Sequence, residues 1–242
     1  MSAKKKAKLC GIQGQLTGIS RQVKDSVADI NNLILKWQAV NSTGLQQLTN
    51  LRAIKLALLS SGTQSVQKNF VVVVSSYSSN LEHAAAELFD TMEQLNDVVS
   101  RLNSVARKFK TLVELDNSIS GKSDTLIFTQ PVSWFEDNAS QLTAMYAKEL
   151  EVKQNIAENA AHVEHFISQK VSTDEVYRKC QDVLMFYSSC WLHQPFVNES
   201  RASLMLAEML RATGHAWTWK KCLEFVGWLL ASCSALWNRK CD

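Results

Sequence analysis

The stretch LEHAAAELFDTMEQLNDVVSRLNSVARKFKTLV, residues 81–113, carries an apolar heptad pattern from end to end. Every seventh residue is large and apolar: Leu81, Leu88, Leu95, Leu102 and Phe109. The residue four positions after each is also apolar: Ala85, Met92, Val99, Ala106 and Val113. Alternating steps of four and three place these side chains on one stripe of a helix, the seam of a coiled coil. We therefore predict a long helix over 80–115, starting at a Ser79–Glu82 capping box, that pairs with a helix of this chain or of another copy.

Glycine and proline usage favours an all-α fold for the rest of the chain. The 242 residues include 8 glycines and 2 prolines, fewer turn formers than a chain of β-strands or of βα units requires. Apolar residues at helical spacing occupy 23–37 and again 45–58, on either side of the polar segment Asn41–Gly44. We predict two antiparallel helices there, which together form a helical hairpin over 19–60.

Start and stop signals divide the C-terminal half into further helices. Ser133 with Glu136, and Ser172 with Glu175, have the spacing of capping boxes. The first box is predicted to open a long helix. The second opens a helical pair whose last member ends at Gly214, since glycine commonly terminates helices.

Between the hairpin and the long helix lies the serine-rich segment SSGTQSVQKNFVVVVSSYSS. Its four valines favour a strand, but no second strand-like run is available to pair with them, so we predict a linker. The predicted fold is an all-α antiparallel helical bundle with a helical hairpin, a long coiled-coil helix and flexible linkers. Its ranges are 1–18 basic flexible N-terminus, 19–60 helical hairpin, 61–79 linker, 80–115 coiled-coil helix, 116–132 loop, 133–171 long helix, 172–215 C-terminal helical pair and 216–242 apolar tail.

The segment WLHQPFV, residues 191–197, is predicted to be a corner between two helices. Pro195 cannot continue a helix, and a proline pushes the residue before it, here Gln194, toward extended geometry. We expect His193 to bond a free carbonyl at the helix end. The apolar side chains expected to pack inside the corner are Trp191, Leu192 and Phe196.

No constellation of catalytic residues is apparent in the sequence, so we expect neither an enzyme nor a bound cofactor. The segment ISGKSD matches a phosphate loop only in part, because Asp116 stands where such a loop needs glycine. A zinc site is an alternative, since His162 and His165 lie three residues apart and so do Cys190 and His193. The wide separation of the two pairs matches no metal motif, which argues against that site.

Charge and cysteine usage narrow the class of protein further. The net charge of +3 gives no strong attraction to nucleic acid, so we expect no direct sequence-specific nucleic-acid binding. The basic N-terminus runs into the polar segment GIQGQLTGIS, which argues against a signal peptide. Six cysteines without CxxC spacing are typical of a reduced intracellular protein.

The C-terminal segment CLEFVGWLLASCSALW, residues 222–237, is strongly apolar. It is shorter than the roughly 20 residues that a membrane-spanning helix needs. An interfacial helix, a partner-binding helix, a tail packed on the helical body and a poorly packed, unpartnered tail all fit this composition. The alternative to a protein-binding role is therefore a membrane-surface-associated coiled-coil protein that uses this tail.

Four stretches, taken in order, resemble the cyclin-dependent kinase 2-interacting protein family. They are NLILKW (32–37), MYAKELEVKQ (145–154), WLHQPFV (191–197) and AEMLRATGH (207–215). The phrase PVSWFEDNASQL fits the same family, and WLHQPFV followed by a helix ending in TGH is the most specific element. The resemblance covers roughly residues 20–215. The valine-rich linker departs from it, and residues 216–242 look like an added or alternative C-terminus.

The resemblance implies a non-catalytic adaptor that connects cyclin-dependent kinase 2 and the Cdc7 kinase to origin recognition and MCM replication proteins. It also implies support of checkpoint signalling by the ATR kinase through the ATR-interacting protein. Family members are further linked to an AAA-ATPase complex that acts in replisome protein turnover and in late maturation of the 60S ribosomal subunit. The implied location is nuclear and chromatin-associated, with the cytoplasm as a second location.

Two groups of side chains are candidate protein-binding residues. The first is the heptad stripe, which is expected to carry self-association as a homodimer or pairing with a partner helix: Leu81, Leu88, Leu95, Leu102 and Phe109. The second is the corner, where aromatic side chains on a rigid turn are suited to anchor a partner: Trp191, His193, Pro195 and Phe196.

Overall fold

The computed structural model describes residues 18–61, 70–120, 126–127, 129–163 and 173–215. Its helices are α1 (Ile19–Ser61), α2 (Phe70–Ser120), α3 (Val132–Ala160), α4 (Thr173–His193) and α5 (Glu199–Ala212). The strands β1 (Leu126–Ile127) and β2 (Gln130–Pro131) form one short antiparallel pair before α3. The predicted all-α class is confirmed.

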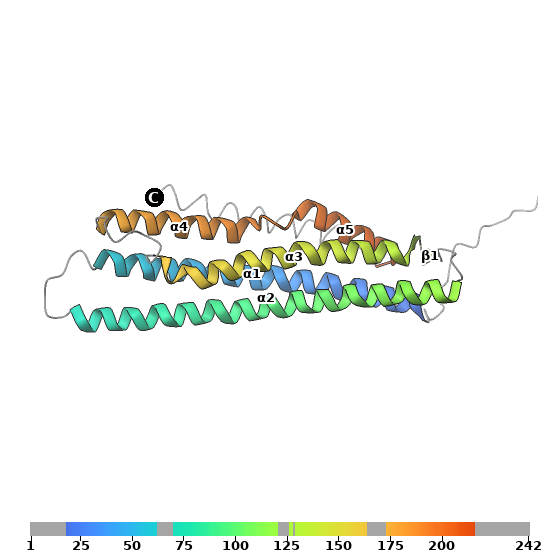
Figure 1. The fold of residues 1–242 in the computed structure, drawn as a ribbon, viewed down its shortest axis with the longest axis horizontal. Helices are drawn as coiled ribbons and strands as arrows, with labels where there is room; N and C mark the ends of the chain where they lie inside the picture. The colour runs from blue at the N-terminus through green and yellow to red at the C-terminus, as the bar shows by residue number, and fades with distance from the viewer. Residues whose placement is uncertain (1–17, 62–69, 121–125, 128, 164–172, 216–242) are drawn as a thin grey trace, which may run out of the picture.

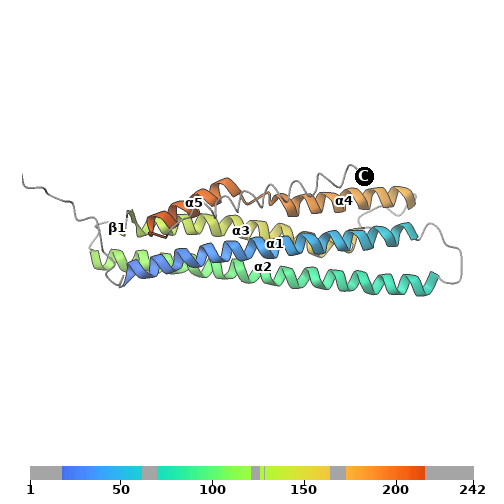
Figure 2. The same cartoon turned by 180° about the vertical axis from the view of Figure 1, so that it is seen from behind.

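The helices form an elongated bundle in which α1, α2, α3 and α4 run alternately in opposite directions, and α5 continues in the direction of α4 (Figure 1). α2 packs against α1 on one side and against α3 on the other. α4 and α5 follow one another along the side of the bundle opposite α2, where α4 packs mainly against α1 (Figures 1 and 2). The fourth rod of the bundle is therefore two helices joined by a corner.

The predicted hairpin over 19–60 is wrong, because α1 continues unbroken through Asn41–Gly44. Glycine lowers helix stability by about 1 kcal/mol relative to alanine, but here its missing side chain makes room for a tryptophan. A Cβ built on Gly44 would overlap Trp191 Cζ2 and would lie 3.1 Å from Thr91 Cγ2. Gly44 thus marks a close helix contact and not a turn.

The predicted linker over 61–79 is wrong for its second half. α2 begins at Phe70 and includes the valine run, so the Ser79–Glu82 capping box does not start the helix. β-Branched residues cost a helix less than about 0.7 kcal/mol each. Extending a helix that already exists also avoids the cost of nucleating a new one. Residues 62–69 lie outside the described residues.

The predicted loop over 116–132 and the helix over 133–171 also have different bounds. α2 continues to Ser120, and α3 starts directly after Pro131, which has φ −70° and ψ 159°. No side chain caps the N-terminus of α3, so the Ser133–Glu136 capping box does not form. α3 ends at Ala160.

The heptad stripe of α2 is buried inside the bundle of one chain. Leu88, Leu95, Leu102 and Phe109 have at most 1% of their surface exposed, while Leu81 is half-buried. The side chains three positions after them, which do not belong to the heptad stripe, are buried too: Ala84, Thr91, Val98, Val105 and Leu112. The buried face is thus wider than a two-stranded seam, because it packs against both α1 and α3.

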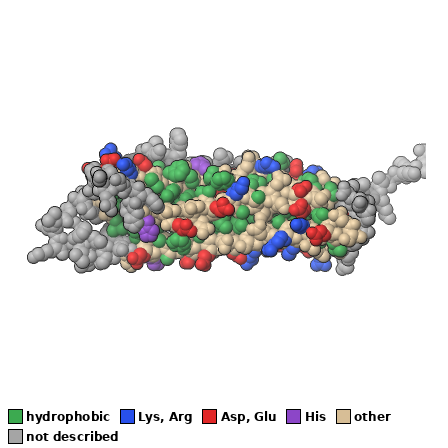
Figure 3. Space-filling model, viewed as in Figure 1, with side chains coloured by type: hydrophobic (Ala, Val, Ile, Leu, Met, Phe, Trp, Pro, Cys, Tyr) green, Lys and Arg blue, Asp and Glu red, His purple; other side chains and the backbone are tan. Residues whose placement is uncertain are grey.

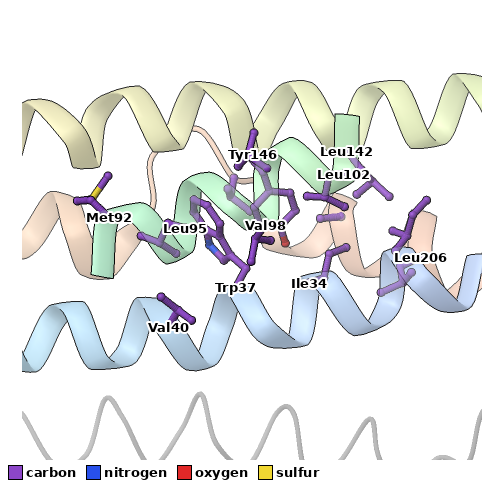
Figure 4. Packing of buried hydrophobic residues seen from close by; sticks show 14 of the residues in the cluster. Ile34, Trp37, Val40, Met92, Leu95, Val98, Leu102, Leu142, Tyr146 and Leu206 are labelled. Atoms are coloured by element: carbon purple, nitrogen blue, oxygen red, sulfur yellow. The ribbon is translucent and has the colours of Figure 1, made fainter. Parts of the chain in front are cut away.

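Figure 4 shows this packing at the middle of the bundle. Trp37 of α1 lies beside Leu95 and Val98 of α2, and Tyr146 of α3 packs against its ring. Phe109 of α2 stacks on Phe135 of α3, with ring centroids 6.3 Å apart. The stripe therefore closes within one chain, and a partner would have to open the bundle to reach it.

α4 and α5 begin and end close to the predicted positions. Asn198 caps α5, since its side-chain oxygen accepts a hydrogen bond from Arg201 N at 2.9 Å. Gly214 has φ +69°, and Gly214 N and His215 N donate to carbonyls of the last turn of α5. The glycine at the end of the last helix is confirmed. The apolar tail 216–242 lies outside the described residues.

Candidate functional site: the corner between α4 and α5

The corner consists of residues 194–198, between the end of α4 and the start of α5. Gln194 has φ +46°, so the prediction of an extended residue before Pro195 is wrong. Gln194 N donates to Cys190 O at 3.1 Å, and Gln194 O accepts from Val197 N at 2.9 Å. The left-handed backbone of Gln194 ends α4, and these two hydrogen bonds offset its steric cost of about 1–2 kcal/mol.

Two buried indoles attach the corner to α1. Trp191, which is fully buried, donates from Nε1 to Asn41 O at 3.0 Å. Trp37 donates from Nε1 to Gln194 Oε1 at 2.7 Å. Tyr146 of α3 meets the Trp37 ring edge-on, with centroids 5.1 Å apart. Because a buried indole N–H needs an acceptor, these bonds fix the orientation of both rings.

A buried ion pair on α3 holds both sides of the corner. Glu149 and Lys153 lie one turn apart with no side-chain exposure, and Lys153 Nζ lies 3.2 Å from Glu149 Oε1. Lys153 Nζ also donates to Trp191 O at 2.9 Å and lies 4.7 Å from the centroid of the Trp191 ring. Glu149 Oε2 accepts from Phe196 N at 3.1 Å. We call Glu149 and Lys153 the clamp.

The electrostatics of the clamp follow from its burial. Loss of hydration lowers the pKa of Lys153 from 10.5 to about 8, although the Glu149 carboxylate acts in the opposite direction. Burial also raises the pKa of the neighbouring Tyr146, and the charge of Glu199 adds to that shift. The clamp lies beneath the surface, so it orients the corner and is not itself a contact surface.

The outer surface of the corner is formed by His193, Pro195 and Phe196, all exposed. Phe196 has 48% of its surface exposed, so the prediction that it packs inside the corner is wrong. Its backbone N–H donates to Glu149 Oε2, which fixes the backbone behind the exposed ring. His193 makes no hydrogen bond within the described part of the chain. Trp191 is buried, as predicted, and is therefore an anchor of the corner and not part of its surface.

Further apolar side chains are exposed on the two helices that flank the corner. Phe186 of α4 is 64% exposed, and Leu204 of α5 is 60% exposed. In the space-filling view, apolar side chains lie scattered among polar ones over this part of the molecule (Figure 3). The corner surface therefore combines exposed aromatic rings with a backbone that buried hydrogen bonds hold rigid.

Three of the stretches that carried the family resemblance meet at this corner. Residues 32–37 supply Trp37, residues 145–154 supply the clamp, and residues 191–197 form the corner itself. The fourth stretch fixes the end of α5, where His215 Nε2 lies 3.2 Å from Lys24 O. The stretches that resemble the family are thus largely the segments that pack together at the corner.

The clamp and the hydrogen bonds of Gln194 were not predicted from the sequence. Glu149 and Lys153 are four residues apart, a spacing that usually marks an exposed pair on a helix surface. One signal was present: Glu149 and Lys153 lie at helical spacing between the apolar residues Tyr146 and Ile156, on the same face of the helix.

The proposed zinc ligands are not brought together in the part of the chain that the structure describes. No group of three or more His, Cys, Asp or Glu side chains with metal-site geometry occurs there. His165 lies outside the described residues, and His162 and His193 are both exposed. None of the described helices is long and apolar enough to cross a membrane.

Comparison with known proteins found curated relatives but no matching family model. The human "Cyclin-dependent kinase 2-interacting protein" is 32% identical over 206 residues, which cover 81% of this chain and 90% of that protein. The proteins of the same name from Bos taurus and Xenopus laevis are 29% identical over 213 residues and 25% identical over 210 residues. They cover 81% and 83% of this chain and 90% and 91% of their own lengths.

Proposed function

The chain belongs to the family of cyclin-dependent kinase 2-interacting proteins, and we propose on that basis that it binds cyclin-dependent kinase 2 as a non-catalytic helical adaptor. An adaptor works by presenting a surface of fixed shape to its partners. The helical bundle, with its continuous buried core, is suited to that role.

The corner carries this proposal because it presents an exposed ring on a rigid support. Partly exposed aromatic side chains on a preorganised backbone make effective anchors, since little conformational entropy is lost on binding. Phe196 and Pro195 are exposed, while the clamp and two indole hydrogen bonds fix the backbone behind them. We propose that Phe196, Pro195 and His193 contact the kinase.

The finer functions that the resemblance implies belong to the same proposal. The chain would connect cyclin-dependent kinase 2 and the Cdc7 kinase to origin recognition and MCM proteins, and would support ATR signalling through the ATR-interacting protein. It would also be a subunit of an AAA-ATPase complex that acts in replisome protein turnover and in 60S subunit maturation. A nuclear, chromatin-associated location follows from these partners.

The test is direct binding of the purified full-length chain to purified cyclin-dependent kinase 2, measured by calorimetry. Phe196→Ser removes the exposed ring of the corner, and we expect at least about a tenfold loss of affinity, as for a typical anchor residue. Leu115→Ser is the matched control, because Leu115 is 43% exposed on α2, opposite the corner rod. That control should bind like the unsubstituted chain.

The outcomes separate the function from the site. If the unsubstituted chain shows no binding to the kinase, the proposed function is wrong. If it binds and Phe196→Ser binds equally well, the kinase uses another surface and the corner is only structural. Circular dichroism of both variants checks that the bundle remains folded.

A further inference from the structure

The outer face of α2 is not covered by any other helix in the described part of the chain. α2 packs against α1 and α3, whereas α4 and α5 lie on the far side (Figures 1 and 2). The side chains opposite the buried stripe are exposed, and at its centre they are small and polar: Asn96, Ser100, Asn103 and Ser104. Such side chains leave room for the close approach of another helix.

Charge is segregated along this face. Between residues 82 and 97 every charged residue of α2 is acidic, and between 101 and 110 every one is basic. The lower edge of the molecule shows the same change, with acidic side chains toward the left and basic ones toward the right (Figure 3). The helix face therefore carries an acidic segment followed by a basic segment, and one exposed carboxylate, Glu114, follows the basic segment.

Four of the exposed charges are arranged symmetrically about Ser100. Glu93 and Arg107 lie seven residues to either side of it, and Asp90 and Lys110 lie ten residues to either side. These offsets correspond to about 10 Å and about 15 Å along the helix axis. A two-fold axis perpendicular to α2 at Ser100 would thus bring each acidic residue level with a basic residue of a second copy.

These four charges have no ion-pair partner in the described part of the chain. By contrast, Asp97 is already paired, with Lys36 Nζ at 3.0 Å and with Arg101 Nε at 2.9 Å. The guanidinium of Arg107 donates one hydrogen bond, to Ser104 Oγ at 3.2 Å. The neighbouring carboxylates of Asp90 and Glu93 repel one another, and so do the two cations, so an antiparallel copy would relieve both repulsions.

We propose that the outer face of α2 binds a second copy of this chain, with the two α2 helices antiparallel and crossing at Ser100. Glu93 pairs with Arg107 of the second copy along the centre of the contact, and Asp90 and Lys110 flank that pair. A parallel arrangement would place like charges together and is disfavoured. Because the contact is polar and exposed at its edges, the association is weak and sensitive to salt.

This contact is separate from the proposed kinase-binding surface. α2 and the rod formed by α4 and α5 lie on opposite sides of the bundle, so a pair of chains would present two corners pointing away from each other. Self-association through α2 is therefore independent of kinase binding.

The test is sedimentation equilibrium of the full-length chain over a range of concentrations at low and at high salt. We expect the average mass to rise from monomer toward dimer at low salt, and the rise to be suppressed at high salt. Two charge-reversal variants interrupt the pairing: Asp90→Lys/Glu93→Lys makes all four positions basic, and Arg107→Glu/Lys110→Glu makes all four acidic. Each should weaken self-association by about tenfold or more.

The decisive control combines all four substitutions in one chain. The combined variant exchanges the acidic and basic charges at the four positions. Its antiparallel pairing is complementary again, so self-association should return. A chain that stays monomeric at every concentration and salt would overturn the proposal. So would association that the double variants leave unchanged, or that the fourfold variant fails to restore. All four positions are exposed, and circular dichroism checks that each variant folds.

Discussion

Replacing Lys153 by methionine keeps most of the side-chain volume but leaves the Glu149 carboxylate buried without its cation. Neither side chain is exposed in the folded chain. Trp191 O loses its charged donor in the same variant. The prediction is a large loss of folding stability from a substitution that a surface pair of the same spacing would tolerate.

The magnitude follows from the burial of the pair. Removing one partner of a buried ion pair typically costs about 3–5 kcal/mol, because the remaining charge stays unhydrated. In a chain of this size, that loss lowers the melting temperature by about 6–20 °C. Lys179→Met removes one partner of Glu175. Their atoms lie 2.9 Å apart and both side chains are nearly half exposed, so the loss of this ion pair should cost less than about 1 kcal/mol.

Urea unfolding followed by circular dichroism measures the free energy of unfolding of both variants. The double variant Glu149→Gln/Lys153→Met provides a further control. Its neutral amide can still accept from Phe196 N, so stability should return to within about 2 kcal/mol of the unsubstituted chain. If Lys153→Met costs no more than Lys179→Met, the clamp is not a buried ion pair and the reasoning fails.

Two further predictions concern the same region. Burial lowers the pKa of Lys153 from 10.5 when exposed to about 8 when folded, so between those values the unfolded chain binds the proton and the folded chain does not. The free energy of unfolding should therefore rise from pH 8 toward pH 10.5 by up to about 3 kcal/mol relative to Lys153→Met. Urea titration at each pH measures the free energy of unfolding of both proteins. If this free energy changes with pH by the same amount in the two proteins, the prediction is wrong. Gly44→Ala should lower the free energy of unfolding by about 1–3 kcal/mol, because the new Cβ would overlap Trp191. An increase, the usual effect of alanine in a helix, would show that Trp191 can move aside.

Apolar periodicity and turn-residue content determined the all-α class and the buried stripe of α2. Leu88, Leu95, Leu102 and Phe109 are buried because side chains repeated every seven residues share one face of any helix. Gly214 ends α5 as predicted, because helix termination is a local property of the backbone. These features depend on residues close together in sequence, which is why sequence analysis found them.

The tertiary structure decided what those local signals could not. Gly44 lies within a helix and not in a turn. A glycine is needed at this position because Trp191, far along the chain, packs where a side chain would be. Glu149 and Lys153 have the spacing of a surface pair, yet they are buried because the corner supplies Trp191 O and Phe196 N as their partners. The number of helices packed around α2 likewise made its buried face wider than a heptad seam. Each of these outcomes depends on contacts between segments distant in sequence, since burial and partners are set only when the helices pack together.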